Sequence, residues 1–134
     1  MRLFPMRLFL ASLLLALPAM AQEAPIKTTI ESQLRALEVD DFVTAFSYAS
    51  PNIKAIFGTP ENFGRMVAQG YPMVHRPKAA KMLDLREVAG GLWQRVLITD
   101  QAGRSHLLDY QMVETADGWQ INAVQLLEST GAGA

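Results

Sequence analysis

The chain of 134 residues contains no cysteine, which excludes a disulfide framework and a thiolate metal site. The same absence excludes a lipid anchor on a cysteine thiol. Stability must therefore come from the burial of apolar side chains, and a chain of this length can build a sufficient core. We expect residues 22–134 to form one domain, with an ordered core from about residue 26 to residue 128.

The chain also lacks the roughly 20 consecutive apolar residues that a helix needs to span a bilayer. Its longest apolar run, Leu8 to Leu17, follows Arg2 and Arg7 and precedes the small residues Ala19-Met20-Ala21. This order is typical of a secretory signal peptide, with an uncleaved anchor as the alternative. The sequence therefore predicts a signal peptide over residues 1–21 and an exported protein, periplasmic or secreted, without a stable membrane anchor.

The chain has no large excess of charge of either sign, since it contains 12 basic and 13 acidic residues. Removal of Arg2 and Arg7 with the signal peptide makes the balance slightly more acidic. Nucleic-acid binding requires Lys and Arg clustered on one face, and the nearest approach, His75 to Lys78, is short. We expect no nucleic-acid partner.

Two amphipathic helices are predicted at the start of the mature chain. Apolar residues recur at helical spacing from Ile26 to Leu37 and again from Phe42 to Ala49. The adjacent carboxylates Asp40 and Asp41 precede the second helix and are typical of a helix cap. They do not resemble a calcium loop, because no further ligand follows at a set spacing.

Prolines mark the next boundaries. Ser50-Pro51 and Thr59-Pro60 each place a capping side chain before a proline at the first helical position, which predicts two more helix starts. These helices are expected to stop at Gly58 and Gly70. From Pro72 to Pro77 we expect an extended crossing segment, because proline disfavours a continued helix.

From Lys81 onward the apolar pattern changes to a period of two, which predicts β-strands. The turn signals Gly90-Gly91, DQAG and TADG separate four runs. These runs are 81–88, 92–99, 104–114 and 119–127. The predicted fold class is α+β, with N-terminal helices packed on one face of a four-stranded or slightly larger antiparallel meander.

Two registers compete for the middle hairpin. A three-residue loop with Gly103 in the left-handed conformation places Val96 and Ile98 on the core face and Arg95 opposite Asp109 on the other face. A four-residue loop would turn Arg95 inward, and burial of an unpaired guanidinium costs several kcal/mol. We therefore prefer the three-residue loop.

The remaining turns complete the predicted core face. A four-residue TADG loop pairs Glu114 with Trp119 and sets Tyr110 opposite Ala123. A two-residue turn at Gly90-Gly91 directs Asp84 and Arg86 away from the helices. The core face then carries Leu83, Leu85, Val96, Ile98, Leu108, Tyr110, Met112, Trp119, Ile121 and Ala123.

Four segments carry a resemblance to known families. They are DDFVTAFSYASPNIKAIFGTPENFGRMVAQGYPMV, LDLRE, HLLDYQMV and DGWQINAVQLL, at residues 40–74, 83–87, 106–113 and 117–127. Together they resemble the bacterial family called domain of unknown function 4864. The closing Trp-x-Ile strand also resembles the nuclear-transport-factor-2-like cone fold. The resemblance implies a cone-like fold and export, and it supplies no activity.

The core face offers one candidate for chemistry, His106 near Tyr110. An imidazole can transfer protons near neutral pH, and a phenol can donate a hydrogen bond. No carboxylate is expected beside this histidine, because Asp84 and Asp109 fall on the other face. The alternative is a hydrogen-bonded or solvated histidine near the end of a strand.

Candidate ligand-binding residues are polar groups expected at or near the space between the helices and the sheet. His75 and Arg76 could clamp an anion at the mouth of a pocket, or simply form a surface connection. The complete candidate set is Tyr71, His75, Arg76, Gln94 and Gln125. Neither a metal site nor a cofactor is expected, because the two histidines are far apart and no phosphate-binding or dinucleotide-binding motif occurs.

The opposite sheet face carries Trp93 among aliphatic residues, beside Arg95 and Asp109. A large aromatic on an otherwise polar face is typical of an association surface, so a homodimer through this open face is expected, with a lone exposed tryptophan as the alternative.

Three functions follow from these patterns. The preferred one is a non-catalytic binding module for a small apolar ligand or a protein partner, because the core-facing positions are mainly apolar. An enzyme using His106 and Tyr110, and a structural dimerisation module, remain as alternatives.

Overall fold

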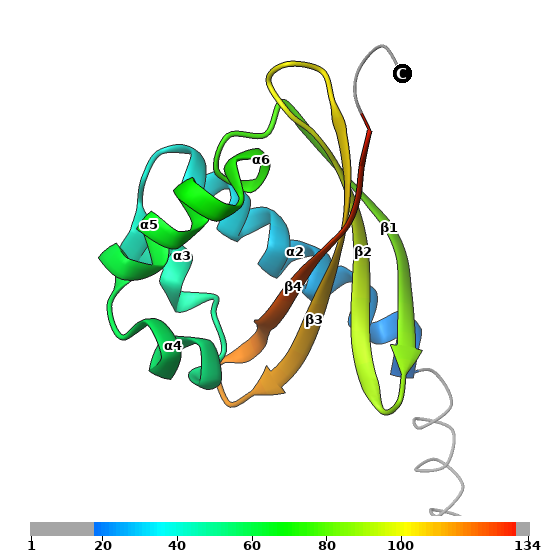
Figure 1. Cartoon of the computed structure of the whole chain (residues 1–134). Helices are drawn as coiled ribbons and strands as arrows, with labels where there is room; N and C mark the ends of the chain where they lie inside the picture. The colour runs from blue at the N-terminus through cyan, green and yellow to red at the C-terminus, as the bar shows by residue number, and fades with distance from the viewer. Residues whose placement is uncertain (1–17, 131–134) are drawn as a thin grey trace, which may run out of the picture.

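The structure, a computed structural model, describes the backbone of residues 18–130 and the side chains of residues 21–129. In this part, the helices α2 (Pro18–Glu38), α3 (Phe42–Ser47), α4 (Pro51–Phe57), α5 (Pro60–Gly70) and α6 (Pro72–His75) precede the strands β1 (Ala79–Val88), β2 (Gly91–Thr99), β3 (Ser105–Thr115) and β4 (Gly118–Thr130). The strands form one antiparallel sheet in the order β1-β2-β3-β4. Figure 1 shows α3 to α6 clustered on one side of the sheet, and α2, which shares one buried core with them, passes behind the strands in this view. The predicted α+β class and the four-stranded meander are confirmed.

Helix α2 supplies the largest apolar stripe of the helical layer. Ile26, Ile30, Leu34 and Leu37 are buried at the predicted spacing. Thr29 Oγ1 donates to the carbonyl of Trp119 at 3.1 Å, which ties the helix to β4. The helix begins at Pro18 and so runs across the predicted cleavage position after Ala21. Residues 1–17 of the predicted signal peptide lie outside the described residues, and the division at residue 21 stays a prediction.

The capping signals in the sequence have the predicted effect. Asp41 Oδ1 accepts from the amide of Thr44 at the start of α3, and the hydroxyls of Ser50 and Thr59 accept from the third amide of α4 and of α5. Gly64 lies within α5 because the ring of Phe42 packs on it, and a Cβ there would lie 2.5 Å from that ring.

The predicted extended segment at Pro72 to Pro77 is wrong, because residues 72–75 form the short helix α6. Pro72 occupies its first turn, where a missing N–H costs no hydrogen bond. The carbonyl of Tyr71 accepts from the amides of Val74 and His75, so the turn closes without a capping side chain.

The β2–β3 hairpin has the preferred register. Val96 pairs with Leu108, Ile98 with His106 and Arg95 with Asp109. Gly103 has a φ of 85°, and its amide donates to the carbonyl of Asp100. Because Val96 and Ile98 are fully buried, the three-residue loop is confirmed.

The β3–β4 hairpin follows the prediction only near its turn. Glu114 pairs with Trp119 and Met112 with Ile121, as expected, but the register then shifts at Asn122. The bulged Asn122 accepts from the Ser50 hydroxyl at 2.7 Å and donates to Gln111 Oε1 at 3.0 Å. This tie between the sheet and the helical layer accounts for the extra residue in β4.

The shift at Asn122 changes which residues of β4 face the core. Tyr110 lies opposite Val124, and Ala123 lies opposite Gln111. Val124 therefore joins the core side, and Gln125 pairs with Asp109 on the open face. The predicted core position of Ala123 is wrong, as is the pairing of Tyr110 with Ala123.

The β1–β2 hairpin turns at Ala89 and Gly90, one residue earlier than predicted, and both have positive φ, 51° and 83°. Leu85 reaches the core as expected, opposite Gln94. Leu83 falls in a register shift and is 37 % exposed, so its predicted core position is wrong. Met82 packs against the core in its place, opposite Val96.

Candidate functional site

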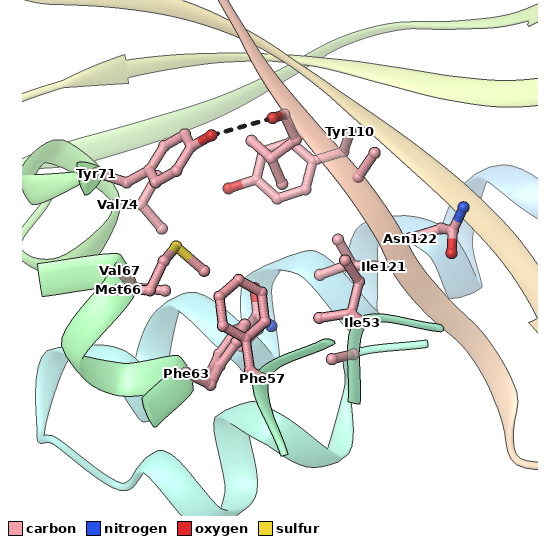
Figure 2. A pocket seen from close by; sticks show the side chains of 14 residues that line it. Ile53, Phe57, Phe63, Met66, Val67, Tyr71, Val74, Tyr110, Ile121 and Asn122 are labelled. Atoms are coloured by element: carbon pink, nitrogen blue, oxygen red, sulfur yellow. Dashed lines mark hydrogen bonds between the residues drawn. The ribbon is translucent and has the colours of Figure 1, made fainter. Parts of the chain in front are cut away.

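A cavity of about 260 Å³ lies between the helical layer and the half of the sheet that β3 and β4 form. Its walls come mainly from α4, α5, α6, β3 and β4, with Gln33 of α2 and Ala49 before α4, and Figure 2 shows the side chains that line it. Phe57, Phe63 and Met66 form one side, where the rings of Phe57 and Phe63 meet edge to face with centroids 6.0 Å apart. None of the lining residues, all of which belong to the described part, carries a charge. The cavity is therefore suited to an apolar molecule.

Tyr110 is the most deeply buried of the polar residues that line this cavity. The side chain is fully buried, and its hydroxyl has no hydrogen-bond partner among the described residues. Figure 2 shows the hydroxyl pointing toward the side of Tyr71 and Val74. Burial raises the pKa of Tyr110 above its usual value, with a smaller contribution from Tyr71. The phenol is therefore neutral and can donate.

The other polar groups around the cavity are engaged. Tyr71, a predicted ligand-binding residue, does line the cavity, and its hydroxyl donates to the carbonyl of Val124 at 3.3 Å. Gln33 Nε2 donates to the carbonyl of Ala45, and the Asn122 amide joins Ser50 and Gln111. Tyr110 thus differs from these neighbours, because its hydroxyl has no acceptor in the part of the chain that the structure describes.

His106, the second predicted catalytic residue, lies elsewhere. It borders a shallow groove with Asp100, His75 and Arg76, whereas Tyr110 lines the cavity. His106 and Tyr110 share a sheet face, as predicted, but the structure does not bring them to one pocket.

His106 has a carboxylate partner, contrary to the prediction. Its Nε2 lies 2.8 Å from Asp100 Oδ2 and its Nδ1 lies 2.7 Å from Ser129 Oγ. Asp100 comes from the β2–β3 loop, where its other oxygen accepts from the amides of Ala102 and Arg104. The hydrogen bond from His106 is the main reason that the pKa of Asp100 lies below its usual value. Both ring nitrogens are used, so this buried histidine links the loop to the end of β4.

His75 and Arg76, the predicted anion clamp, hold a carboxylate of the protein itself. Asp40 Oδ1 lies 2.7 Å from His75 Nε2, and both Asp40 oxygens lie 3.2 Å from the Arg76 guanidinium. Arg76 also donates to the carbonyl of Leu37. The hydrogen bond from His75 is the largest cause of the lowered pKa of Asp40. The pair therefore fastens α6 to the end of α2.

The two predicted glutamines do not reach the cavity. Gln94 is buried on the helix-covered face, where its Nε2 donates to the carbonyl of Leu83 in the irregular part of β1. Gln125 is exposed and pairs with Asp109 on the open face, because the bulge at Asn122 reverses its direction. Its predicted position on the core face is wrong.

The open face carries the predicted Trp93, Arg95 and Asp109, together with Arg86. Arg86 donates to both Asp109 oxygens at 3.0 and 2.7 Å, and Arg95 lies 3.7 Å from the same carboxylate. Asp109 is 5 % exposed, and its hydrogen bond is the main reason that the pKa of Arg86 is raised. Arg95 Nε is buried and has no hydrogen-bond partner among the described residues.

Sequence reasoning missed several of these residues. The sequence does not identify Phe57, Phe63 and Met66 as cavity residues, because an apolar residue on a helix gives no sign of whether it faces a side chain or a cavity. Asp100 and Ser129 were missed because they lie at the ends of strands. An aspartate in a tight turn near the histidine was the one available signal.

Within residues 18–130, no three metal-ligating side chains come together, and no helix is long and apolar enough to cross a membrane. Comparison with curated proteins and with solved structures finds no match, so the resemblance to the cone fold stays a prediction. Residues 19–134 match a protein family described as Domain of unknown function (DUF4864). The resemblance of the four sequence segments to this family is thereby confirmed, and the chain belongs to the DUF4864 family.

Proposed function

We propose that this protein is an exported, non-catalytic binding module that holds a small apolar ligand between α4, α5, α6 and the β3–β4 half of the sheet. The observation that carries the proposal is the cavity of about 260 Å³ with uncharged, mainly apolar walls. A cavity of about 150 Å³ lined by aliphatic and aromatic side chains is enough to bind benzene. The available space therefore suits a molecule of one or two rings, or a short chain.

A binding role is favoured over catalysis by the way the polar groups are used. General acid-base work requires convergent groups within reach of one substrate. His106 is bonded at both nitrogens and borders a different depression from Tyr110. The other titratable side chain that lines the cavity, Tyr71, already donates to the carbonyl of Val124, so the cavity is better suited to hold a molecule than to transform it.

Export is supported by the position of Pro25 within α2. A proline in the interior of a helix removes one hydrogen bond and is costly. Cleavage after Ala21 would place Pro25 fourth in the new chain, among the residues whose N–H groups have no helical partner. Intact-mass analysis of periplasmic protein is expected to show an N-terminus at Gln22; retention of residues 1–21 in the membrane fraction would contradict export.

Ligand binding is tested with ethylbenzene as the probe and thermal unfolding as the readout. Saturating ethylbenzene should raise the melting temperature of the wild-type protein, because a ligand that binds only the folded state stabilises it. Val67→Phe fills the cavity from α5 and should abolish this shift. Ile56→Phe is the matched control, since Ile56 is 63 % exposed and does not line the cavity. A wild-type protein that shows no shift would refute the proposal.

The second candidate function, self-association through the open sheet face, is favoured by the unpartnered Nε of Arg95 beside the half-buried Trp93. A second copy could bury Trp93 and offer an acceptor to this guanidinium. Sedimentation of the mature protein is expected to show a dimer that Trp93→Ala dissociates. A monomer at all concentrations, unchanged by Trp93→Ala, would rule this function out.

A further inference from the structure

We infer that the ligand of this cavity is an uncharged molecule carrying one hydrogen-bond acceptor, a carbonyl or ether oxygen, that pairs with the hydroxyl of Tyr110. This inference rests on the proposed function, and it assigns to Tyr110 the role of the residue that sets ligand specificity.

The hydrogen-bond donor is the hydroxyl of Tyr110. Tyr110 is fully buried, and its hydroxyl has no protein partner among the described residues. Buried polar groups in proteins are nearly always hydrogen-bonded, and each exception calls for an explanation. Figure 2 shows this hydroxyl on the cavity side of the ring, between Tyr71 and the helical wall. A ligand oxygen in the cavity would supply the acceptor that the fold does not.

The described residues around Tyr110 do not supply the acceptor that its hydroxyl lacks. Tyr71 lines the same cavity, and its hydroxyl already donates to the carbonyl of Val124. Val124 lies directly opposite Tyr110 in the sheet, but its carbonyl accepts the hydrogen bond from Tyr71. Two tyrosines thus approach one cavity, and one of them keeps its donor for an outside partner.

The walls exclude charge. No Lys, Arg, His, Asp or Glu lines the cavity, so a carboxylate or an ammonium group would lose its hydration without gaining a counter-charge. Burial also keeps Tyr110 in its neutral form, which can donate to an oxygen but offers no charge to a cation. A neutral ketone, aldehyde or ether of one or two rings has the required chemistry.

The test measures dissociation constants by calorimetry for three probes of similar size: acetophenone, ethylbenzene and benzoate. The proteins are the wild type, Tyr110→Phe and the matched control Tyr71→Phe. For acetophenone, Tyr110→Phe should weaken binding about tenfold, the size expected for one buried hydrogen bond. For ethylbenzene the same substitution should change affinity less than about twofold. The hydroxyl of Tyr71 is already bonded to Val124, so Tyr71→Phe should change the affinity for both neutral probes by the same factor. Benzoate should bind the wild type at least about a hundredfold more weakly than acetophenone.

The possible outcomes separate this inference from the proposed function. If ethylbenzene and acetophenone bind but Tyr110→Phe affects them equally, the inference is overturned and the binding function stands. Benzoate binding as tight as that of acetophenone would overturn the requirement for an uncharged ligand. If neither neutral probe binds the wild type, the proposed function fails and takes the inference with it. Circular dichroism of both variants checks that they are folded.

Discussion

Strand β3 buries polar side chains in two kinds of surroundings. His106 and Asp109 are 8 % and 5 % exposed, and each meets polar partners, Asp100 and Ser129 for the first and two arginines for the second. Tyr110 is fully buried on the same strand, and its hydroxyl meets none among the described residues. A buried polar group that is paired contributes modestly to stability, whereas an unpaired one costs about 1–3 kcal/mol. The paired groups therefore hold loops and strands together, and the unpaired one marks where an external partner is needed.

The largest effect is expected from breaking a paired group on the open face. Asp109→Asn removes the charge that holds Arg86 and lies near Arg95. Loss of one member of a buried ion pair costs about 3–5 kcal/mol, and the partial exposure of both guanidinium groups should reduce this to about 2–4 kcal/mol. Urea unfolding measures the change. Asp117→Asn, in an exposed turn, is the control and should be nearly silent; a cost for Asp109→Asn as small as that of the control would show that the pairing contributes little.

A smaller loss is expected at the paired histidine. His106→Leu keeps most of the side-chain volume and removes both ring nitrogens, which deprives Asp100 and Ser129 of their partner. The free energy of unfolding should fall by about 1–2 kcal/mol. Ser129→Ala removes one of the two bonds and should cost less than half as much. Equal costs for the two variants would mean that the Asp100 contact is not stabilising.

The pH dependence of stability provides a second test of the pairing between His106 and Asp100. The folded pKa of Asp100 lies below the ordinary value of 3.8, chiefly because His106 is its hydrogen-bond partner. The folded state therefore binds fewer protons than the unfolded state, and this stabilisation is present above about pH 3.8 and is lost as the pH falls through the lower folded pKa. Between pH 6 and pH 3, the stability of His106→Leu should fall less steeply than that of the wild type. Parallel curves would contradict the assigned cause.

The sequence was sufficient for most of the fold because its signals were local. Ser50-Pro51 and Thr59-Pro60 mark helix starts through a cap and a proline, and the cost of a buried Arg95 selected the register of the β2–β3 hairpin. Both kinds of signal depend on a few neighbouring residues. They were confirmed together with the α+β class.

The errors arose where distant residues decide the backbone. The shift at Asn122 depends on Ser50, which is 72 positions away, and no pattern within β4 reveals it. An extra residue reverses the faces of the side chains that follow it, which is why Val124 rather than Ala123 packs on the core and Gln125 lies on the open face. The cavity could not be predicted for a related reason. Tyr110 was predicted on the correct face, but the sequence pattern gives no sign of whether its hydroxyl finds an acceptor, and among the described residues it finds none.

The smallest expected effect has the opposite sign and concerns the unpaired hydroxyl of Tyr110 itself. Urea unfolding of Tyr110→Phe, without added ligand, should show a free energy of unfolding about 1 kcal/mol higher than that of the wild type, because the variant no longer buries an unpaired hydroxyl. Tyr71→Phe, which loses a bond to Val124, should be destabilised by about 0.5–1.5 kcal/mol. A Tyr110→Phe protein that is less stable than the wild type, by as much as Tyr71→Phe, would show that the hydroxyl is already satisfied and would contradict the account.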